Sequence, residues 1–181
     1  MPELPEVEVV KQSLEKKIKF QKINKVLVRN RNLRFKVPKN FEFFLKNKKI
    51  NKISRKSKYL IFHLNNDKFC ILHLGMTGTL HLVRNKKINK FTNLSFYSLG
   101  SIPNNHNHIE FKFLKFKIIY NDPRRFGYFK IINSNRDLIS FFKRIGPEPL
   151  EKKFNFNYLK EKFKNIKKNI KNLILDQKII S

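Results

Sequence analysis

Residues 1–18, MPELPEVEVVKQSLEKKI, set the start of the fold. Pro5 and the two glutamates that follow it are typical of a helix start, because proline suits the first turn and acidic side chains complement the positive end of the helix dipole. Apolar residues then recur at spacings of three and four, at Val7, Val10, Leu14 and Ile18. The sequence therefore predicts a helix with one buried face, and it places Pro2 and Glu3 immediately ahead of the first turn.

Pro2 is a candidate nucleophile. Removal of the initiator methionine, which a small second residue permits, would leave it with a free secondary amine. The pKa of such an amine lies near the α-amino range of about 7.7–8.0, so that part of it is unprotonated at neutral pH. An unprotonated amine can attack an aldehyde-like carbon and form an iminium ion. A proline in second place also starts many chains without any catalytic role, so Pro2 needs support from other residues.

The middle of the chain, from Lys22 to about Ile132, is mostly typical of β-strands. Short β-branched or aromatic runs occupy residues 25–28, 59–64, 69–74, 79–83, 109–113 and 117–120. Several alternate between polar and apolar residues, which indicates sheets with one buried face. Residues 65–67 and 75–78 are expected to form hairpin turns. We therefore predict two packed antiparallel sheets.

The rest of the chain divides into a long connection and a helical end. The segment 82–107 is rich in Asn and Lys and is interpreted as the connection, whereas residues 136–145 form a helix that Gly146 and Pro147 end. A lysine-dense helical stretch follows from 158 to about 180, and its apolar residues are expected to be exposed: Leu173, Ile174, Ile179 and Ile180. The predicted class is α+β, mainly β. The predicted domains are 1–132, a helix and linker over 133–150, and 151–181.

The charge of the chain favours a polyanionic partner. Lys and Arg number 41 against 13 Asp and Glu, which gives a net charge of +28 and a pI near 10.4. An A/T-rich gene would also inflate the lysine content, so we ascribe about half of the excess to composition. The single cysteine, Cys70, excludes an intrachain disulfide and is expected to be a buried strand thiol. With no apolar run of about 18 residues and no secretory signal, we expect a cytoplasmic protein.

Five segments in order carry a resemblance to a known family: the opening octet 1–8, Ser57-Lys58-Tyr59-Leu60, residues 73–78 (HLGMTG), residues 122–127 (DPRRFG) and residues 146–150 (GPEPL). Together they resemble the formamidopyrimidine-DNA glycosylases, the bacterial enzymes that excise oxidised purines. The resemblance runs from residue 2 to residue 150. The endonuclease VIII-like branch of the superfamily also begins with a Pro-Glu pair, but Leu4 and the set of Met76, Arg124 and Phe126 favour the formamidopyrimidine branch.

The resemblance implies three catalytic residues. Pro2 would attack C1′ of the damaged nucleotide and displace the base, and Glu3 would act beside it in acid/base chemistry. Lys58 would lie near the damaged base and the adjacent phosphate, where its charge would lower the pKa of the Pro2 amine. The alternative is that Glu3 and Lys58 are ordinary surface charges.

The resemblance also implies five DNA-binding residues. Met76, Arg124 and Phe126 match the side chains that fill the gap left by an extruded nucleotide. Arg125 and His106 would hold backbone phosphates. The alternative for Met76 and Phe126 is ordinary core, but glycine-bounded loops favour exposure. Asn107 stands where the family often has an acid, which changes the local hydrogen bonding.

The end of the chain departs from the family. There, a segment like residues 175–178 leads into a Gly-Ile-Gly-Asn turn of a helix–two-turn–helix element, and a four-cysteine zinc finger follows. Here the chain stops at Ser181. We therefore expect the helical DNA-binding domain to be incomplete and the zinc finger absent, with no cofactor in this chain. His106 and His108 lack further ligands at suitable spacing, so no metal site is predicted.

Three functions remain open on the sequence. The first is a bifunctional enzyme that removes 8-oxoguanine and formamidopyrimidines and cleaves the abasic site by β,δ-elimination. The second is a catalytically weak DNA-binding remnant, and the third is one part of a split or frameshifted glycosylase. The expected partner is double-stranded DNA with an oxidised purine or abasic site. We expect a monomer that associates with the nucleoid and has no membrane contact.

Overall fold

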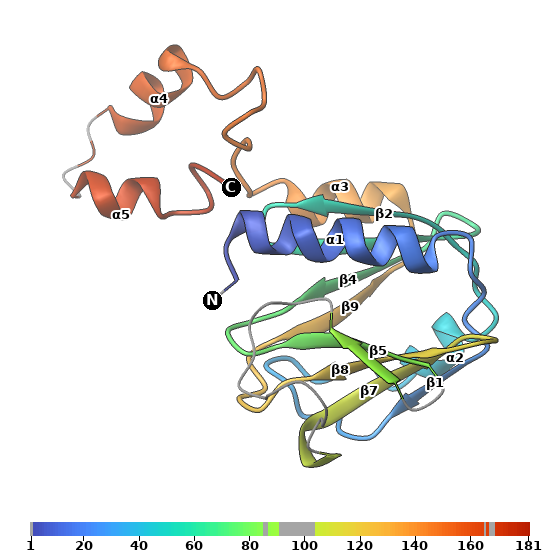
Figure 1. The fold of residues 1–181 in the computed structure, drawn as a ribbon. Coiled ribbons are helices and arrows are strands. Elements are labelled where there is room, and N and C mark those ends of the chain that lie inside the picture. The colour runs from blue at the N-terminus through green and yellow to red at the C-terminus, as the bar shows by residue number, and fades with distance from the viewer. Residues whose placement is uncertain (1, 85–86, 91–103, 165, 167–168) are drawn as a thin grey trace. The chain divides into compact units, whose positions relative to one another are not determined.

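The computed structural model describes residues 2–84, 87–90, 104–164, 166 and 169–181. The chain forms two compact units, Met1–Asn135 and Arg136–Ser181. Within the described residues, the first contains two α-helices and two β-sheets, and the second contains helices (Figure 1).

Helix α1 (Leu4–Ile18) begins at Glu3, as the sequence predicts. Glu3 has an extended backbone, its N–H donates to the Glu6 carboxylate at 2.8 Å, and its carbonyl accepts the first helical hydrogen bond from Val7 N–H at 3.1 Å. These contacts satisfy groups that a helix end otherwise leaves without partners. The predicted apolar stripe is buried, each of its four residues at most 2% exposed, and α1 packs against β2 (Ile50–Lys56) and β3 (Tyr59–Leu64).

The two antiparallel sheets predicted from the alternation pattern are confirmed (Figure 1). One sheet has the order β1-β7-β8-β5-β6, with bounds Lys25–Val28, Asn107–Lys112, Lys117–Asn121, Thr79–Arg84 and Lys87–Lys90. The other has the order β2-β3-β4-β9, in which β4 is Phe69–His73 and β9 is Tyr128–Ile132. The 3-10 turn η1 (Asn104–His106) precedes β7.

One of the two expected hairpins is wrong. Residues 65–67 do join the paired strands β3 and β4, with Asn66 and Asp67 at positive φ. Residues 75–78, however, lead from β4, which pairs with β3 and β9, to β5, which pairs with β6 and β8. This turn therefore crosses from one sheet to the other. Turn residues indicate where a chain reverses, but they do not indicate which strand it meets afterwards.

Several elements escaped the sequence prediction. Helix α2 (Phe41–Leu45) and strands β2 and β9 were not singled out, and β6 lies inside the segment expected to be a long connection. Residues 91–103 of that connection lie outside the described residues. Strand β2 mixes basic and apolar residues, with a burial pattern in which only Ile50 and Ile53 are fully buried, so its periodicity is weak.

The second unit contains α3 (Asn135–Phe142), α4 (Phe156–Phe163) and α5 (Ile170–Ile174). A single helix from 158 to about 180 is wrong, because the chain starts a new helix at Asn169, whose side chain accepts from Lys171 N–H at 2.9 Å. Two of the four apolar residues expected to be exposed, Leu173 and Ile179, are buried, whereas Ile174 is 49% exposed. Hydrogen bonds from Gly146 N–H to Gln177 O and from Ser181 N–H to Pro147 O hold the last residues in place.

The predicted burial of Cys70 is confirmed, which makes the thiol a probe of the core. Cys70 is 2% exposed and lines an apolar cavity of about 20 Å³ between the sheets. Burial raises the pKa of the Cys70 thiol, which suppresses the reactive thiolate. We predict that the native protein resists a chromogenic disulfide reagent at pH 8 and that one thiol per chain reacts after addition of guanidinium. Rapid labelling of the native protein would contradict this packing.

Candidate functional site

Two of the three predicted catalytic residues are in direct contact, and the third is adjacent in sequence. Lys58 lies in the turn between β2 and β3, and its Nζ lies 2.6 Å from Glu3 Oε2 at the start of α1. The Lys58 side chain is only 16% exposed, so it is not an ordinary solvated surface charge, whereas Glu3 is 58% exposed. Pro2, directly before Glu3, is buried. The fold thus brings a lysine from a distant part of the sequence to the amino-terminal Pro-Glu pair.

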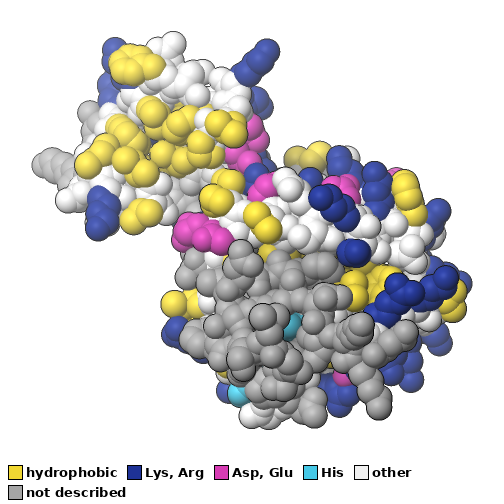
Figure 2. Space-filling view, viewed as in Figure 1, with side chains coloured by type: hydrophobic (Ala, Val, Ile, Leu, Met, Phe, Trp, Pro, Cys, Tyr) yellow, Lys and Arg dark blue, Asp and Glu magenta, His cyan; other side chains and the backbone are white. Residues whose placement is uncertain are grey.

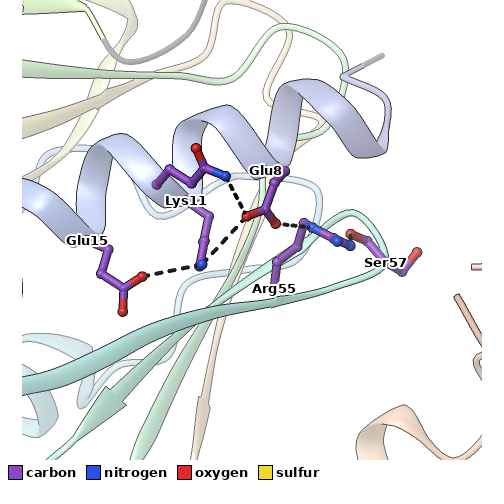
Figure 3. A network of polar contacts seen from close by, with 6 residues as sticks. Glu8, Lys11, Glu15, Arg55 and Ser57 are labelled. Carbon is purple, nitrogen blue, oxygen red and sulfur yellow. Dashed lines mark hydrogen bonds and ion pairs between the residues drawn. The ribbon is translucent and has the colours of Figure 1, made fainter. Parts of the chain in front are cut away.

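A second ion pair fixes this turn to the helix (Figure 3). Arg55 on β2 donates from Nε to Glu8 Oε2 at 2.8 Å and from Nη1 to the carbonyl of Ser57 at 3.1 Å. Ser57 has a φ of +52°, a left-handed conformation that is unfavourable for a residue other than glycine. Arg55 therefore links helix α1 to the backbone immediately before Lys58.

Four predicted DNA-binding residues line one cleft. Met76 comes from the turn after β4, and Arg124, Arg125 and Phe126 come from the loop before β9. The cleft has a volume of about 720 Å³, and its lining also contains Asn32, Leu33, Arg34, His73 and Gly75. Met76 and Phe126 are each 40% exposed, as expected from their loops. Met76 is also the one exposed side chain between Phe69 and Leu82.

His73 belongs to this cleft although the sequence analysis did not single it out. Its ring stacks on Tyr128 with centroids 5.5 Å apart, and Nδ1 accepts from Gly75 N–H at 3.1 Å. Burial, and then the charges of Arg34 and Lys58, lower the pKa of His73 to about 4. The ring is therefore neutral at physiological pH, and it lies within the electrostatic influence of Lys58 while lining the cleft. The sequence signal for His73 was a polar, titratable residue at the end of an apolar strand, three residues before Met76.

The turn and loop that form the cleft meet at the buried carboxylate of Asp122. Its Oδ1 accepts from the Thr77 hydroxyl, and its Oδ2 accepts from Tyr120 Oη and from Gly127 N–H, each at 2.9 Å. The Asp122 N–H donates to the carbonyl of the half-buried His106 at 3.0 Å. The predicted phosphate ligand His106 is thereby tied to the loop that carries the other basic residues.

The position at which the sequence departs from the family pattern is also satisfied. Asn107 is 6% exposed, and its Oδ1 accepts from Asn121 Nδ2 at 2.8 Å. Asn107 and Asn121 are also partners in the β7–β8 register, at an irregularity of the ladder. The Asn107 side-chain oxygen therefore has a hydrogen-bond donor in the buried environment between β7 and β8.

Two other features are absent from the described residues. No group of three or more His, Cys, Asp or Glu side chains in this part of the chain is arranged to hold a metal ion. Among the helices within the described ranges, none combines the length and the apolar character needed to span a membrane.

The ion pair between Arg55 and Glu8 should contribute measurably to stability. Burial alone would raise the pKa of Glu8, but the hydrogen bonds from Arg55 and Gln12 and the charges of Lys11 and Arg55 outweigh it, so the pKa is lowered. We predict that Arg55→Met lowers the free energy of unfolding by about 1 kcal/mol at pH 7. A carboxyl group whose pKa is lowered on folding stabilises the folded state while the group is ionised. The difference in unfolding free energy between Arg55→Met and wild type should therefore shrink as the pH falls below about 4.3, the pKa of an unperturbed glutamate.

Lys11→Met provides the matched control for Arg55→Met in urea unfolding curves. Lys11 Nζ lies 3.5 Å from Glu8 Oε1 and 3.3 Å from Glu15 Oε2, and all three residues are on helix α1. Its loss should change the unfolding free energy by only about 0.3–0.5 kcal/mol. Equal effects of the two substitutions would show that the bond between helix and turn has no special role.

Comparisons with known proteins identify the family of the chain. A family model described as the formamidopyrimidine-DNA glycosylase N-terminal domain matches residues 1–129. A formamidopyrimidine-DNA glycosylase of Wolbachia pipientis subsp. Culex pipiens (strain wPip) is 40% identical over 181 residues, which cover 99% of this chain and 61% of the relative. Its counterpart in Agrobacterium fabrum (strain C58 / ATCC 33970) is 33% identical over 186 residues and is covered to 62%.

Solved structures agree as well. The Lactococcus lactis Fpg in complex with an abasic site containing DNA matches with a TM-score of 0.83 and 33% identity, over 99% of this chain and 62% of that one. A complex of the same enzyme with a N7-Benzyl-Fapy-dG containing DNA matches with a TM-score of 0.81 and 34% identity. The chain spans about three fifths of the length of the relatives it matches. Since the family model covers well over half of its 181 residues, the chain belongs to the formamidopyrimidine-DNA glycosylase family.

Proposed function

We propose that this protein acts in DNA base-excision repair, as an N-glycosylase that removes oxidised purines such as 8-oxoguanine and formamidopyrimidines and as a lyase at the resulting abasic site. The observation that carries the proposal is the contact between Lys58 and Glu3 at 2.6 Å beside Pro2. An unprotonated amine nucleophile, a carboxylate and the Lys58 ammonium group together supply the groups that this chemistry requires.

In the proposed reaction, the Pro2 amine attacks C1′ and the bond from C1′ to the base nitrogen breaks, so that the base leaves with the electron pair of that bond. The proton that the Pro2 nitrogen gives up passes to the departing base. Glu3 protonates the sugar ring oxygen, and the ring opens to give the iminium ion. Loss of a proton from C2′ then expels the 3′ phosphate, and a second elimination expels the 5′ phosphate. Hydrolysis of the iminium returns the free amine. Lys58 is held at Glu3, the residue that follows Pro2, and a cation near the amine would favour its unprotonated form.

The cleft supports the binding part of the proposal. Extruding a nucleotide costs a few kcal/mol in lost stacking, and side chains must fill the gap. Arg124 lies over the ring of Phe126, with Cζ 4.5 Å from the ring centroid, so a planar cation and an aromatic wedge are presented together. Met76 lines the same cleft. Arg125 and His106 would bind phosphates, and the net charge of +28 would make binding salt-sensitive.

A second candidate function is DNA binding with little or no turnover. The observations that favour it are the net charge of +28 and the cleft lined by Arg124 and Arg125, which would bind duplex without any covalent step. In either case we propose that the protein acts as a monomer on double-stranded DNA.

Borohydride trapping distinguishes the two candidates. We predict that the chain, incubated with an abasic-site duplex and a reductant, gives a covalent protein–DNA band on a denaturing gel, because reduction fixes the iminium. Pro2→Gly, which replaces the secondary amine by a primary one, should weaken the band strongly while binding of the duplex in a gel-shift assay remains. Absence of a wild-type band with intact binding would reject the enzyme and support the second candidate.

Substrate preference provides a further prediction. Preformed abasic sites require no base recognition and are extruded at low cost, so we predict much faster cleavage of these sites than excision of intact 8-oxoguanine. Single-turnover rates on two duplexes that differ only at the lesion measure the ratio. Comparable rates on both would contradict the prediction.

A further inference from the structure

We infer that Asp122 is a positioning residue for the insertion step: it holds the side chains that enter the DNA without taking part in the chemistry at Pro2. This inference rests on the proposed function. Asp122 is fully buried and is not among the residues that line the cleft. Its influence on DNA must therefore pass through the groups bound to it.

Asp122 and the groups hydrogen-bonded to it form a network, called the Asp122 web below. Arg124 is bound to this web, and Met76 and Phe126 each directly precede a residue that is bound to it. Met76 precedes Thr77, whose hydroxyl donates to Asp122 Oδ1. Phe126 precedes Gly127, whose N–H donates to Oδ2 at 2.9 Å. Arg124 donates its own N–H to Thr77 Oγ1 at 3.2 Å. One carboxylate thus fixes the backbone at all three positions.

The Thr77 hydroxyl acts as a link whose direction Asp122 determines. A hydroxyl has one proton to donate and lone pairs to accept with. Because a carboxylate can only accept, the Thr77 proton points to Asp122, and the oxygen lone pairs are left to accept from Arg124 N–H. The turn of residues 75–78 and the loop of residues 122–127 are therefore joined in one hydrogen-bond arrangement.

The backbone of Asp122 extends the web to the predicted phosphate ligands. Its N–H donates to His106 O at 3.0 Å, and its carbonyl accepts from Arg125 N–H at 3.2 Å and from His108 Nε2 at 2.7 Å. Arg125 has a φ of +56°, a strained conformation for arginine that this loop maintains. The exposed residues of the loop are consequently presented in a fixed geometry.

Tyr120 is a buried donor to Asp122, and the neighbouring glycines leave space for its hydroxyl. Burial, and then the charge of Asp122 and its hydrogen bond, raise the pKa of Tyr120 well above its usual value, so its hydroxyl stays a donor. A Cβ atom on Gly78 would lie 2.7 Å from this hydroxyl, and one on Gly127 would collide with it. Both motif glycines therefore leave the room that Tyr120 needs to reach Asp122 Oδ2.

Asp122→Asn tests the inference, because an amide has nearly the same shape but only one acceptor oxygen. We expect the variant to fold, as judged by near-ultraviolet circular dichroism. The rate of insertion into a duplex should fall about 10- to 100-fold, as expected for groups that are misplaced by up to about 1 Å. Insertion is measured in stopped flow from the fluorescence of 2-aminopurine beside a tetrahydrofuran abasic analogue, which needs no catalysis.

A single-stranded abasic oligonucleotide provides the second readout. It has no base stack to fill, so borohydride trapping on it should stay within about twofold of wild type for Asp122→Asn, whereas trapping on duplex falls. Pro2→Gly should strongly reduce trapping on both the single-stranded and the duplex substrate. If wild type traps neither substrate, the proposed enzyme fails, and the fluorescence measurement still decides the role of Asp122.

Glu110→Gln is the matched control, because Glu110 is also a buried carboxylate, 3% exposed, but is bound by Arg29 and Lys117 on another part of the sheet. It should reduce thermal stability without an insertion defect. If Asp122→Asn does not fold, Thr77→Val should reproduce the defect and Thr77→Ser should not. Unchanged fluorescence, or equal loss on single-stranded and duplex substrates, would overturn the inference.

Discussion

A carboxylate that is removed from water is tolerated only where donors surround it, because an unsatisfied buried charge costs several kcal/mol. Asp122 imposes this constraint on the first unit. Its side chain and backbone require partners from the turn after β4, from the loop before β9, from strand β8 and from the segment before β7. In the structure these four segments, which include those that carry the exposed residues of the cleft, meet at Asp122.

The amino terminus depends on a different balance. The apolar stripe of α1 anchors the helix to β2 and β3, but a buried stripe alone permits small rotations and shifts along the axis. The bond between Arg55 and Glu8 restricts that freedom beside Ser57, the residue before Lys58 (Figure 3). Hydrophobic burial thus supplies most of the attachment, whereas a directional ion pair sets the contact at Glu3.

Local patterns in the sequence predicted local structure well. The stripe of α1, the burial of Cys70 and the exposure of Met76 and Phe126 follow from spacing and from loop position. Non-local pairing could not be derived in this way: nothing in residues 75–78 shows that they join two sheets, and the partner of Lys58 lies 55 residues away. His73 was missed because its importance comes from neighbours that only the fold supplies.

The apolar surface of the second unit is unusually large for its size. Leu150, Phe156, Ile170 and Leu175 are each more than half exposed, and hydrophobic side chains gather on one face of this unit (Figure 2). Apolar side chains exposed together favour contacts with other molecules over contact with water. For handling the isolated chain, this means that solubility and colloidal behaviour are governed by the 46 residues of this unit (Arg136–Ser181) rather than by the well-packed sandwich, however favourable the charge of +28.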